Sequence, residues 1–176
     1  GEVVTHGWTT KTGASVEDRM VELRDLVGGF LVTFVEREGR MAGTDLEATS
    51  RLKAVCGDAK LTVAGGFTTA EDIALADKAG ADAQVGMALY SGALHLADAI
   101  AAPLVSDRPD GLWPTVVCDG HARALGLVYS DLESLRTAVD RQVGAYHSRK
   151  RGLWVKGETS GATQELLKID LDCDRD

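Results

Sequence analysis

Residues 60–87 read KLTVAGGFTTAEDIALADKAGADAQVGM, and this stretch decides the fold. It opens with a short apolar run that ends in two glycines. A helical pattern follows, which Thr69 can cap at its start and Gly80 can end, and a second short apolar run closes the stretch. A strand, a helix and a strand in this order form a parallel unit whose strands are buried on both faces. The stretch therefore predicts an α/β sheet.

The same alternation of strand and helix extends over the first hundred residues. Strands are expected at residues 2–6 and 29–35, and helices at 15–27, 44–56, 87–92 and 93–102. Ser15 and Thr44 are the expected N-caps of the two longer helices. About four units are too few for an eightfold barrel, which needs roughly 250 residues. The pattern is that of half a barrel or of a small doubly wound sheet.

The second part of the chain has a different texture. Residues 103–110 contain two prolines and read as a linker. Beyond them the pattern predicts an antiparallel α+β domain over residues 111–176. Its expected elements are a hairpin over 112–130, a helix over 130–143 capped by Ser130 with Glu133, a strand over 145–149, a loop over 150–162 and a strand over 163–174.

Composition excludes several classes of protein. The chain has 176 residues, 44% apolar and 26% charged, which is typical of a globular protein. Its net charge of −8 disfavours nucleic-acid binding, and no apolar run approaches the roughly 18 residues of a membrane span. Three widely spaced cysteines, Cys56, Cys118 and Cys173, indicate a reducing compartment, for which we expect the cytoplasm. The opening GEVVTHGW lacks a methionine and reads like the interior of a longer protein.

Glycines follow three successive predicted strands. Any one of them is explained by a turn, but three sets at the same edge of a parallel sheet favour a phosphate site, because backbone N–H groups can approach an anion where no Cβ intervenes. The residues concerned are Gly39, Gly65, Gly66, Gly86 and Met87.

The stretch SRKRGLWVKGETSG, residues 148–161, combines cations, glycines and hydroxyls. This mixture suits phosphate and ribose recognition, although a solvated basic loop is the simpler alternative. Trp154 either stacks on a flat base or belongs to the core. The candidate ligand-binding residues are Arg149, Arg151, Lys156, Glu158, Thr159 and Ser160.

The sequence ends LDCDRD, residues 171–176. On a strand, Asp172, Asp174 and Asp176 would line one face and Cys173 the other. Clustered carboxylates suit Mg²⁺, and a thiolate suits Zn²⁺. The alternative is an acidic, solvated chain end with one incidental cysteine.

The blocks GEVVTHGW, FLVTFVEREGRMAGTDLE, VAGGFTTAEDI and VGMALYSG resemble the C-terminal half of phosphoribosylformimino-AICAR-phosphate isomerase, over residues 1–102. The resemblance implies half of a (β/α)8 TIM barrel whose substrate carries two phosphates. It places Trp8 on the substrate-facing loop after the fifth barrel strand, and the glycines above together with Met87 in phosphate-binding loops. The family usually has aspartate where Glu38 stands, and its two catalytic aspartates are expected outside this chain.

The stretches DGLWPTVV, YHSRKRG, LWVKGETSG and DLDCDRD resemble phosphoribosyl-AMP cyclohydrolase, over residues 110–176. This family opens a purine ring by adding water. The resemblance implies Mg²⁺ ligands at Asp172, Asp174 and Asp176, one Zn²⁺ ligand at Cys173, phosphoribosyl nucleotides as substrates and a homodimer. The family's two further cysteines and its histidine are expected beyond Asp176, and SDLESL replaces a more usual Met-Asn before the helix.

Together the two resemblances imply an internal fragment of a bifunctional histidine-biosynthesis enzyme. It would consist of an α/β half-barrel followed by a small α+β cyclohydrolase domain, with no nucleic-acid or membrane partner. Two alternatives stay open. One is a non-catalytic phosphate- or nucleotide-binding protein, and the other is a half-barrel like the cyclase subunit of the same pathway, over which GEVVTHGW favours the isomerase.

Overall fold

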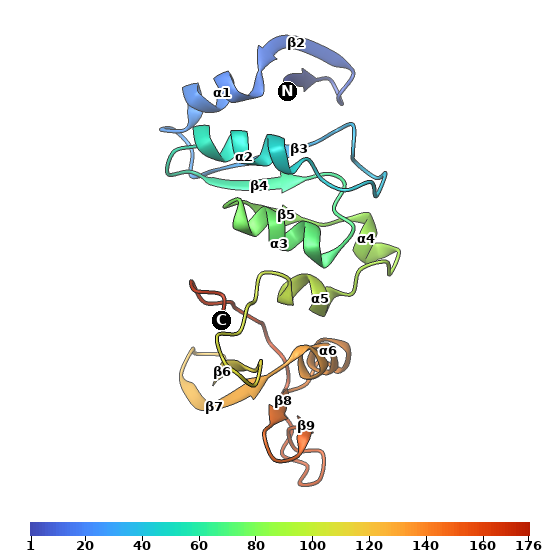
Figure 1. The fold of residues 1–176 in the computed structure, drawn as a ribbon, viewed down its shortest axis with the longest axis vertical. Helices are drawn as coiled ribbons and strands as arrows, with labels where there is room; N and C mark the ends of the chain where they lie inside the picture. The colour runs from blue at the N-terminus through green and yellow to red at the C-terminus, as the bar shows by residue number, and fades with distance from the viewer. The chain divides into compact units, whose positions relative to one another are not determined.

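The computed structural model describes all residues from 1 to 176. The chain divides into two compact units, residues 1–95 and 96–176, which are described separately. Figure 1 gives the element labels. No helix is long and apolar enough to cross a membrane.

The first unit is built on a parallel sheet of three strands in the order β3-β4-β5. These strands are β3 (Gly29–Thr33), β4 (Lys60–Ala64) and β5 (Asp82–Gln84). Helices α2 (Leu46–Val55) and α3 (Ala70–Lys78) connect them and lie on one side of the sheet (Figure 1). The parallel sheet predicted from the sequence is confirmed.

The core of this unit lies between the sheet and its helices. Leu61 and Val63 point from β4 toward the helices and are almost fully buried, as are Leu52 of α2 and Ala76 of α3. On the other face of the sheet, Leu31 is 59% exposed. Burial of both faces was expected, but the face away from the helices is open at Leu31 and is buried at Ala64.

Two of the three predicted caps in this unit are confirmed. The Ser15 side chain accepts from the Asp18 N–H at the start of α1 (Val16–Leu23), and Thr69 forms a capping box with Asp72. The prediction for Thr44 was wrong. Because α2 begins at Leu46, the capping position falls on Asp45, whose carboxylate accepts from the Ala48 N–H at 2.8 Å.

The N-terminal strand does not join the parallel sheet. Strand β1 (Glu2–Thr5) pairs antiparallel with β2 (Thr10–Ser15) in a separate hairpin. The sequence analysis missed β2 because TKTGAS is polar and carries no apolar alternation. The turn between the two strands holds Trp8 at a φ of 71°, an unusual conformation for a bulky residue.

The second unit is a four-stranded antiparallel sheet in the order β6-β7-β8-β9. Helix α6 (Leu132–Arg141) packs on this sheet, and its Ala138 joins Ala145 and Val155 in a small core. The predicted hairpin and helix are confirmed. The strands are β6 (Trp113–Cys118), β7 (Ala124–Ser130), β8 (Ala145–Ser148) and β9 (Gly152–Val155).

Two short helices complete the fold. Helix α4 (Met87–Tyr90) belongs to the first unit. Helix α5 (Leu96–Ala101) packs on α6 in the second, where Arg136 makes two hydrogen bonds to Asp98, at 2.7 and 2.8 Å. The structural units therefore divide after His95, whereas the sequence analysis placed residues 1–102 in the first domain.

Three expectations for the second unit were wrong. The N-cap of α6 is Asp131, which forms a capping box with Ser134, in place of Ser130 and Glu133. Residues 152–155 form strand β9, where a loop was expected.

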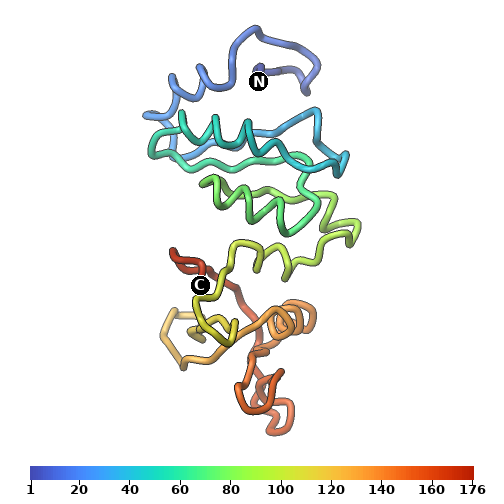
Figure 2. The backbone as a smooth tube through the Cα atoms, in the orientation of Figure 1, coloured from blue at the N-terminus to red at the C-terminus, as the bar shows by residue number.

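The third wrong expectation is the strand over 163–174. It is reduced to a single bridge between Val143 and Glu165, and near its end the chain turns back between Asp172 and Arg175, which an extended strand cannot do. The chain from residue 156 to 176 instead follows an irregular path, drawn in orange to red in Figure 2.

Replacing Leu61 by alanine tests the core of the first unit. We expect the free energy of unfolding to fall by about 2–5 kcal/mol, because the fully buried side chain leaves a cavity. The matched control is Leu26→Ala, at a site that is 79% exposed, with an expected change of about 0.5 kcal/mol or less. Urea unfolding measures both variants, and equal losses would contradict this placement of the core.

Candidate functional site

A solvent-open hollow of about 360 Å³ lies where β3, β4 and β5 end. The structure brings the five predicted phosphate-loop residues together around it. Its lining residues are Glu38, Gly39, Met41, Ala64, Gly65, Gly66, Phe67, Gln84, Gly86 and Met87. Trp8 does not line this hollow, and it is 55% exposed on the β1–β2 turn. The role of each residue toward a ligand stays a prediction.

Close backbone packing explains two of these glycines. Gly65 and Gly66 have φ values of 101° and 92°, which L-residues with a side chain rarely adopt. A Cβ on Gly66 would lie 2.2 Å from the Gly43 carbonyl oxygen, and one on Gly65 would lie 2.6 Å from that of Phe34. The two glycines therefore let the segment from 34 to 43 close over the end of β4.

The hollow lacks the positive side chains that are typical of an anion-binding site. Glu38 is its one charged lining residue, and no lysine or arginine lines it. An oxyanion bound there would depend on backbone N–H groups and would be opposed by the Glu38 carboxylate.

In the second unit, two predicted cations share one aromatic ring. The Arg151 guanidinium lies 5.3 Å from the Trp154 ring centroid, and the Lys156 ammonium lies 5.6 Å from it. The Tyr146 ring is 5.9 Å away and tilted by 53°. Trp154 is half-buried, so it packs within the unit and also presents its ring to cations.

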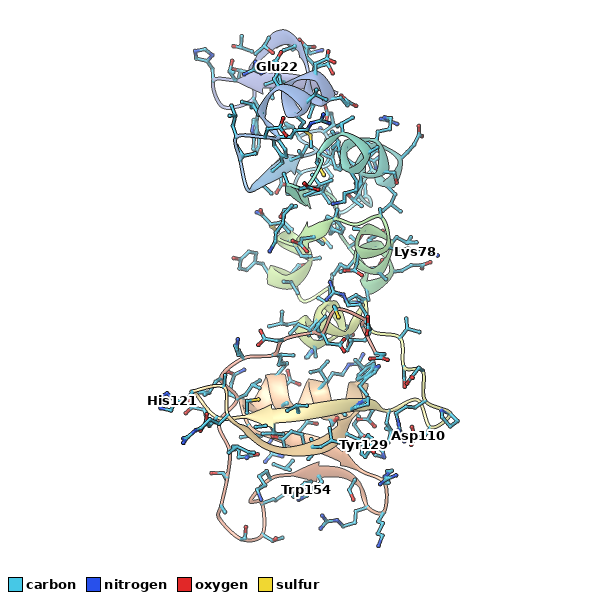
Figure 3. The ribbon with its side chains drawn as sticks, turned by 90° about the vertical axis from the view of Figure 1, so that its left-hand side faces the viewer. Glu22, Lys78, Asp110, His121, Tyr129 and Trp154 are labelled. Atoms are coloured by element: carbon cyan, nitrogen blue, oxygen red, sulfur yellow. The ribbon has the colours of Figure 1, made fainter.

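The remaining predicted binding residues are separated by strand β9. Arg149 precedes β9 and lies against Tyr129, whereas Glu158 follows β9 and pairs with Arg141 at 3.7 Å on an exposed surface. Thr159 and Ser160 are exposed in the loop after β9. Figure 3 labels Tyr129 and Trp154. The predicted set therefore does not form one cluster.

An aspartate and a histidine form a pair that the sequence analysis missed. His147 Nδ1 lies 2.6 Å from Asp131 Oδ2, and both side chains are about one quarter exposed. The other Asp131 oxygen accepts from the Ser134 N–H at 2.8 Å. Partial burial would raise the pKa of Asp131, but the hydrogen bonds from Ser134 and His147 outweigh it and lower that pKa. An aspartate just before the helix with a serine three residues later is a sequence signal for the Asp131 cap, but it does not point to His147.

The acidic chain end does not have the strand geometry expected of it. The backbone folds back, so that Asp172 Oδ1 accepts from the Arg175 N–H at 2.9 Å. Cys173 Sγ lies 3.6 Å from an Asp174 carboxylate oxygen. No group of three or more histidine, cysteine, aspartate or glutamate side chains is arranged to hold a metal ion.

One acidic residue at the chain end nevertheless has a shifted pKa. Desolvation raises the pKa of Asp176, and the negative charges of Asp107, Asp172 and Asp174 raise it further. Carboxylate oxygens are the donors that Mg²⁺ prefers, so the donor type fits this ion. One thiolate, Cys173, does not complete a zinc site, which takes at least three protein ligands.

The structure thus combines a parallel sheet that ends in a glycine-lined hollow with an antiparallel α+β unit that carries cation–aromatic contacts. Comparison with known families specifies the class. The profile described as histidine biosynthesis protein matches residues 1–95, and the profile described as phosphoribosyl-AMP cyclohydrolase matches residues 126–176. The chain belongs to the histidine biosynthesis protein family, with a cyclohydrolase domain behind its first part. Both resemblances inferred from the sequence are confirmed.

Known relatives include multifunctional histidine biosynthesis proteins and a phosphoribosyl-AMP cyclohydrolase. The chain is 45% identical over 134 residues to a histidine biosynthesis trifunctional protein of Neurospora crassa, which covers 76% of this chain and 13% of that protein. It is 52% identical over 83 residues to a bifunctional histidine biosynthesis protein of Schizosaccharomyces pombe. The aligned region is 47% of this chain and 20% of that protein. It is 40% identical over 88 residues to the phosphoribosyl-AMP cyclohydrolase of Thermobifida fusca. The aligned region is 49% of this chain and 76% of that protein. The chain thus spans a small part of the multifunctional relatives and most of the single-domain one.

Substituting Gly66 by alanine tests the packing beneath the hollow. We expect the free energy of unfolding to fall by about 3 kcal/mol or more, because the new Cβ would overlap the Gly43 carbonyl and the backbone is left-handed there. Gly7→Ala is the control. Gly7 is also left-handed but has open space around it, so about 1–2 kcal/mol is expected. Thermal unfolding compares the two, and a Gly66→Ala protein as stable as the control would contradict the close approach.

The Asp131–His147 pair has a pH signature. Because the folded pKa of Asp131 is lowered, its contribution to stability is present above the unfolded pKa of about 4 and is lost as pH falls through the folded value. Asp131→Asn keeps a capping side chain but loses the charge, so the stability difference from wild type should shrink at acid pH. The same comparison in a His147→Gln background, which lacks the imidazole, measures how much of this pH dependence comes from the pair. A difference that stays constant down to about pH 2 would contradict the lowered pKa.

Proposed function

We propose that residues 111–176 are the N-terminal part of a cyclohydrolase domain that opens the purine ring of phosphoribosyl-AMP. The observation that carries this proposal is the likeness to the Thermobifida fusca cyclohydrolase, 76% of which the chain covers. In this hydrolysis the water oxygen bonds to C6, the N1–C6 bond breaks and N1 takes a proton. The reaction needs an activated water, a way to deliver that proton and a hold on the substrate phosphates.

The cations around Trp154 are suited to holding the substrate. Arg151 and Lys156 are free of ion pairs in the structure and lie within 6 Å of one indole ring. Phosphate oxygens accept charge-assisted hydrogen bonds from such groups. The exposed part of the ring offers an apolar face to a flat base. We infer that this cluster is where a phosphoribosyl nucleotide makes contact.

Metal ions are the second requirement. We propose that Asp172, Asp174 and Asp176 hold Mg²⁺, because carboxylate oxygens are the donors that this hard cation prefers. Desolvation raises the pKa of Asp176, and nearby negative charges, those of Asp172 and Asp174 among them, raise it further, so a cation beside it would be favourable. Cys173 would supply one thiolate to Zn²⁺. A metal of this kind lowers the pKa of bound water. The structure shows one fixed contact here, in which the backbone and side-chain N–H groups of Arg175 bind Asp172.

For residues 1–102 we propose the C-terminal half of a (β/α)8 isomerase barrel that acts in the same biosynthesis. The glycine-lined hollow at the ends of β3, β4 and β5 supports this proposal, since barrel enzymes bind phosphate at this edge of the sheet. We expect Trp8 to face the substrate from the β1–β2 turn. A cytoplasmic homodimer is the expected form of the whole protein.

A non-catalytic nucleotide-binding protein is the second candidate. The observation that favours it is that no three metal-ligating side chains converge in the structure. The two candidates differ in one outcome, since only the enzyme consumes phosphoribosyl-AMP.

The test is ring opening of phosphoribosyl-AMP by the full-length protein, followed by ultraviolet absorbance with Mg²⁺ and Zn²⁺ present. We expect activity in the wild type and a rise in KM of roughly tenfold in Arg151→Gln or Lys156→Gln, because each loses a charge-assisted hydrogen bond. Arg141→Gln, which breaks only the exposed pair with Glu158, is the control and should change KM by less than about twofold. A folded, metal-loaded protein that binds phosphoribosyl-AMP without opening its ring supports the binding protein.

A further inference from the structure

Two guanidinium groups lie against the ring of Tyr129. The Arg108 Cζ atom is 4.7 Å from the ring centroid and the Arg149 Cζ atom is 4.8 Å from it. Arg108 comes from the segment before β6, and Arg149 from the turn between β8 and β9. Distances under 6 Å over an aromatic face are those of cation–π interactions, which hold a guanidinium plane in a fixed orientation. Residues distant in sequence thus meet at one tyrosine.

The two arginines differ in what their N–H groups do. Arg108 donates from Nε and Nη2 to the two carboxylate oxygens of Asp110, both at 2.9 Å, so its charge is paired. Asp110 lies two residues away and closes a tight local loop. The Arg149 guanidinium makes no hydrogen bond and no ion pair in the structure, and it lies against the tyrosine ring. It is held in place with all its donors unused.

The backbone beneath the ring is fixed. Tyr129 in β7 is the direct cross-strand partner of His147 in β8, and His147 is tied to Asp131 at 2.6 Å. Asp131 itself caps α6. The helix start, both strands and the tyrosine are therefore joined by local contacts. A side chain that stacks on Tyr129 is attached to a rigid part of the unit.

The positive charges of Arg108 and Arg149 lie at the same ring and repel each other unless a negative group compensates for them. Asp110 neutralises Arg108, but no carboxylate in the structure pairs with Arg149. An arginine with free, oriented donors binds planar or tetrahedral oxyanions bidentately. Fixing its orientation beforehand removes part of the entropy that binding would otherwise cost.

We propose that Tyr129 is a positioning residue, which holds the Arg149 guanidinium ready to bind a phosphate group of the phosphoribosyl nucleotide. This inference rests on the proposed cyclohydrolase function and adds to it the residue that orients the anion-binding arginine. Arg108 and Asp110 support the ring from the neighbouring segment and do not bind the anion. In this proposal the aromatic ring of Tyr129 orients the guanidinium, and the phenolic hydroxyl has no part in it.

The test is steady-state ring opening of phosphoribosyl-AMP by variants of the full-length metal-loaded protein. Arg149→Gln should raise KM roughly thirtyfold, and Tyr129→Leu roughly fivefold, with kcat within about twofold of wild type in both. Tyr129→Phe keeps the ring and should leave KM within about twofold of wild type. In the double variant, Tyr129→Leu should add little to Arg149→Gln, because the ring acts only through the arginine.

Several outcomes overturn the inference. One is a Tyr129→Leu protein with wild-type KM beside an Arg149→Gln protein with a raised KM. Others are full additivity in the double variant, or a Tyr129→Phe protein as impaired as Tyr129→Leu. Thermal unfolding of each variant separates this role from a purely structural one, which would lower stability without a selective change in KM. A wild-type protein that does not open the ring overturns the proposed function itself, so the two failures are distinct.

Discussion

The parallel register of β3, β4 and β5 is the constraint on which the first unit depends. Thr33 pairs with Ala64 and Ala64 with Gln84, so the three strands end level with one another. The loops that follow them must then share one edge of the sheet. Because two of those loops pass within van der Waals contact of each other, the chain needs Gly66 where a side chain would strike Gly43. The hollow is a consequence of this register and of the glycines that permit it.

The second unit has only a small hydrophobic core. Its antiparallel sheet and its two helices, α5 and α6, bury few large side chains, and contacts at the start of α6 add to the order of the unit. Asp131 caps the helix and also holds His147 on the neighbouring strand. The exposed basic residues are then organised by two aromatic rings, Tyr129 and Trp154. This arrangement places positive groups on aromatic rings without burying charge, as the proposed contact with a phosphorylated nucleotide requires.

Much of the fold followed from local pattern, and the failures have physical reasons. The parallel unit and the caps at Ser15 and Thr69 depend on neighbours in sequence, and all were confirmed. Strand β2 was missed because its residues are polar. The expected C-terminal strand was wrong because the chain turns back between Asp172 and Arg175, a contact that an alternating pattern does not predict. The Asp131–His147 contact joins residues 16 apart in sequence, and no local pattern announces it. Metal binding at Asp172, Asp174 and Asp176 stays a prediction.

We propose that the protein containing this chain hydrolyses a purine ring. The most direct measurement is mass spectrometry of the product formed from phosphoribosyl-AMP in water labelled with heavy oxygen. The account predicts that one labelled oxygen appears in the new carboxamide of the product, since water supplies the atom that bonds to C6. Substrate recovered unchanged by a folded protein with both metals bound, or a product without the label, would contradict it.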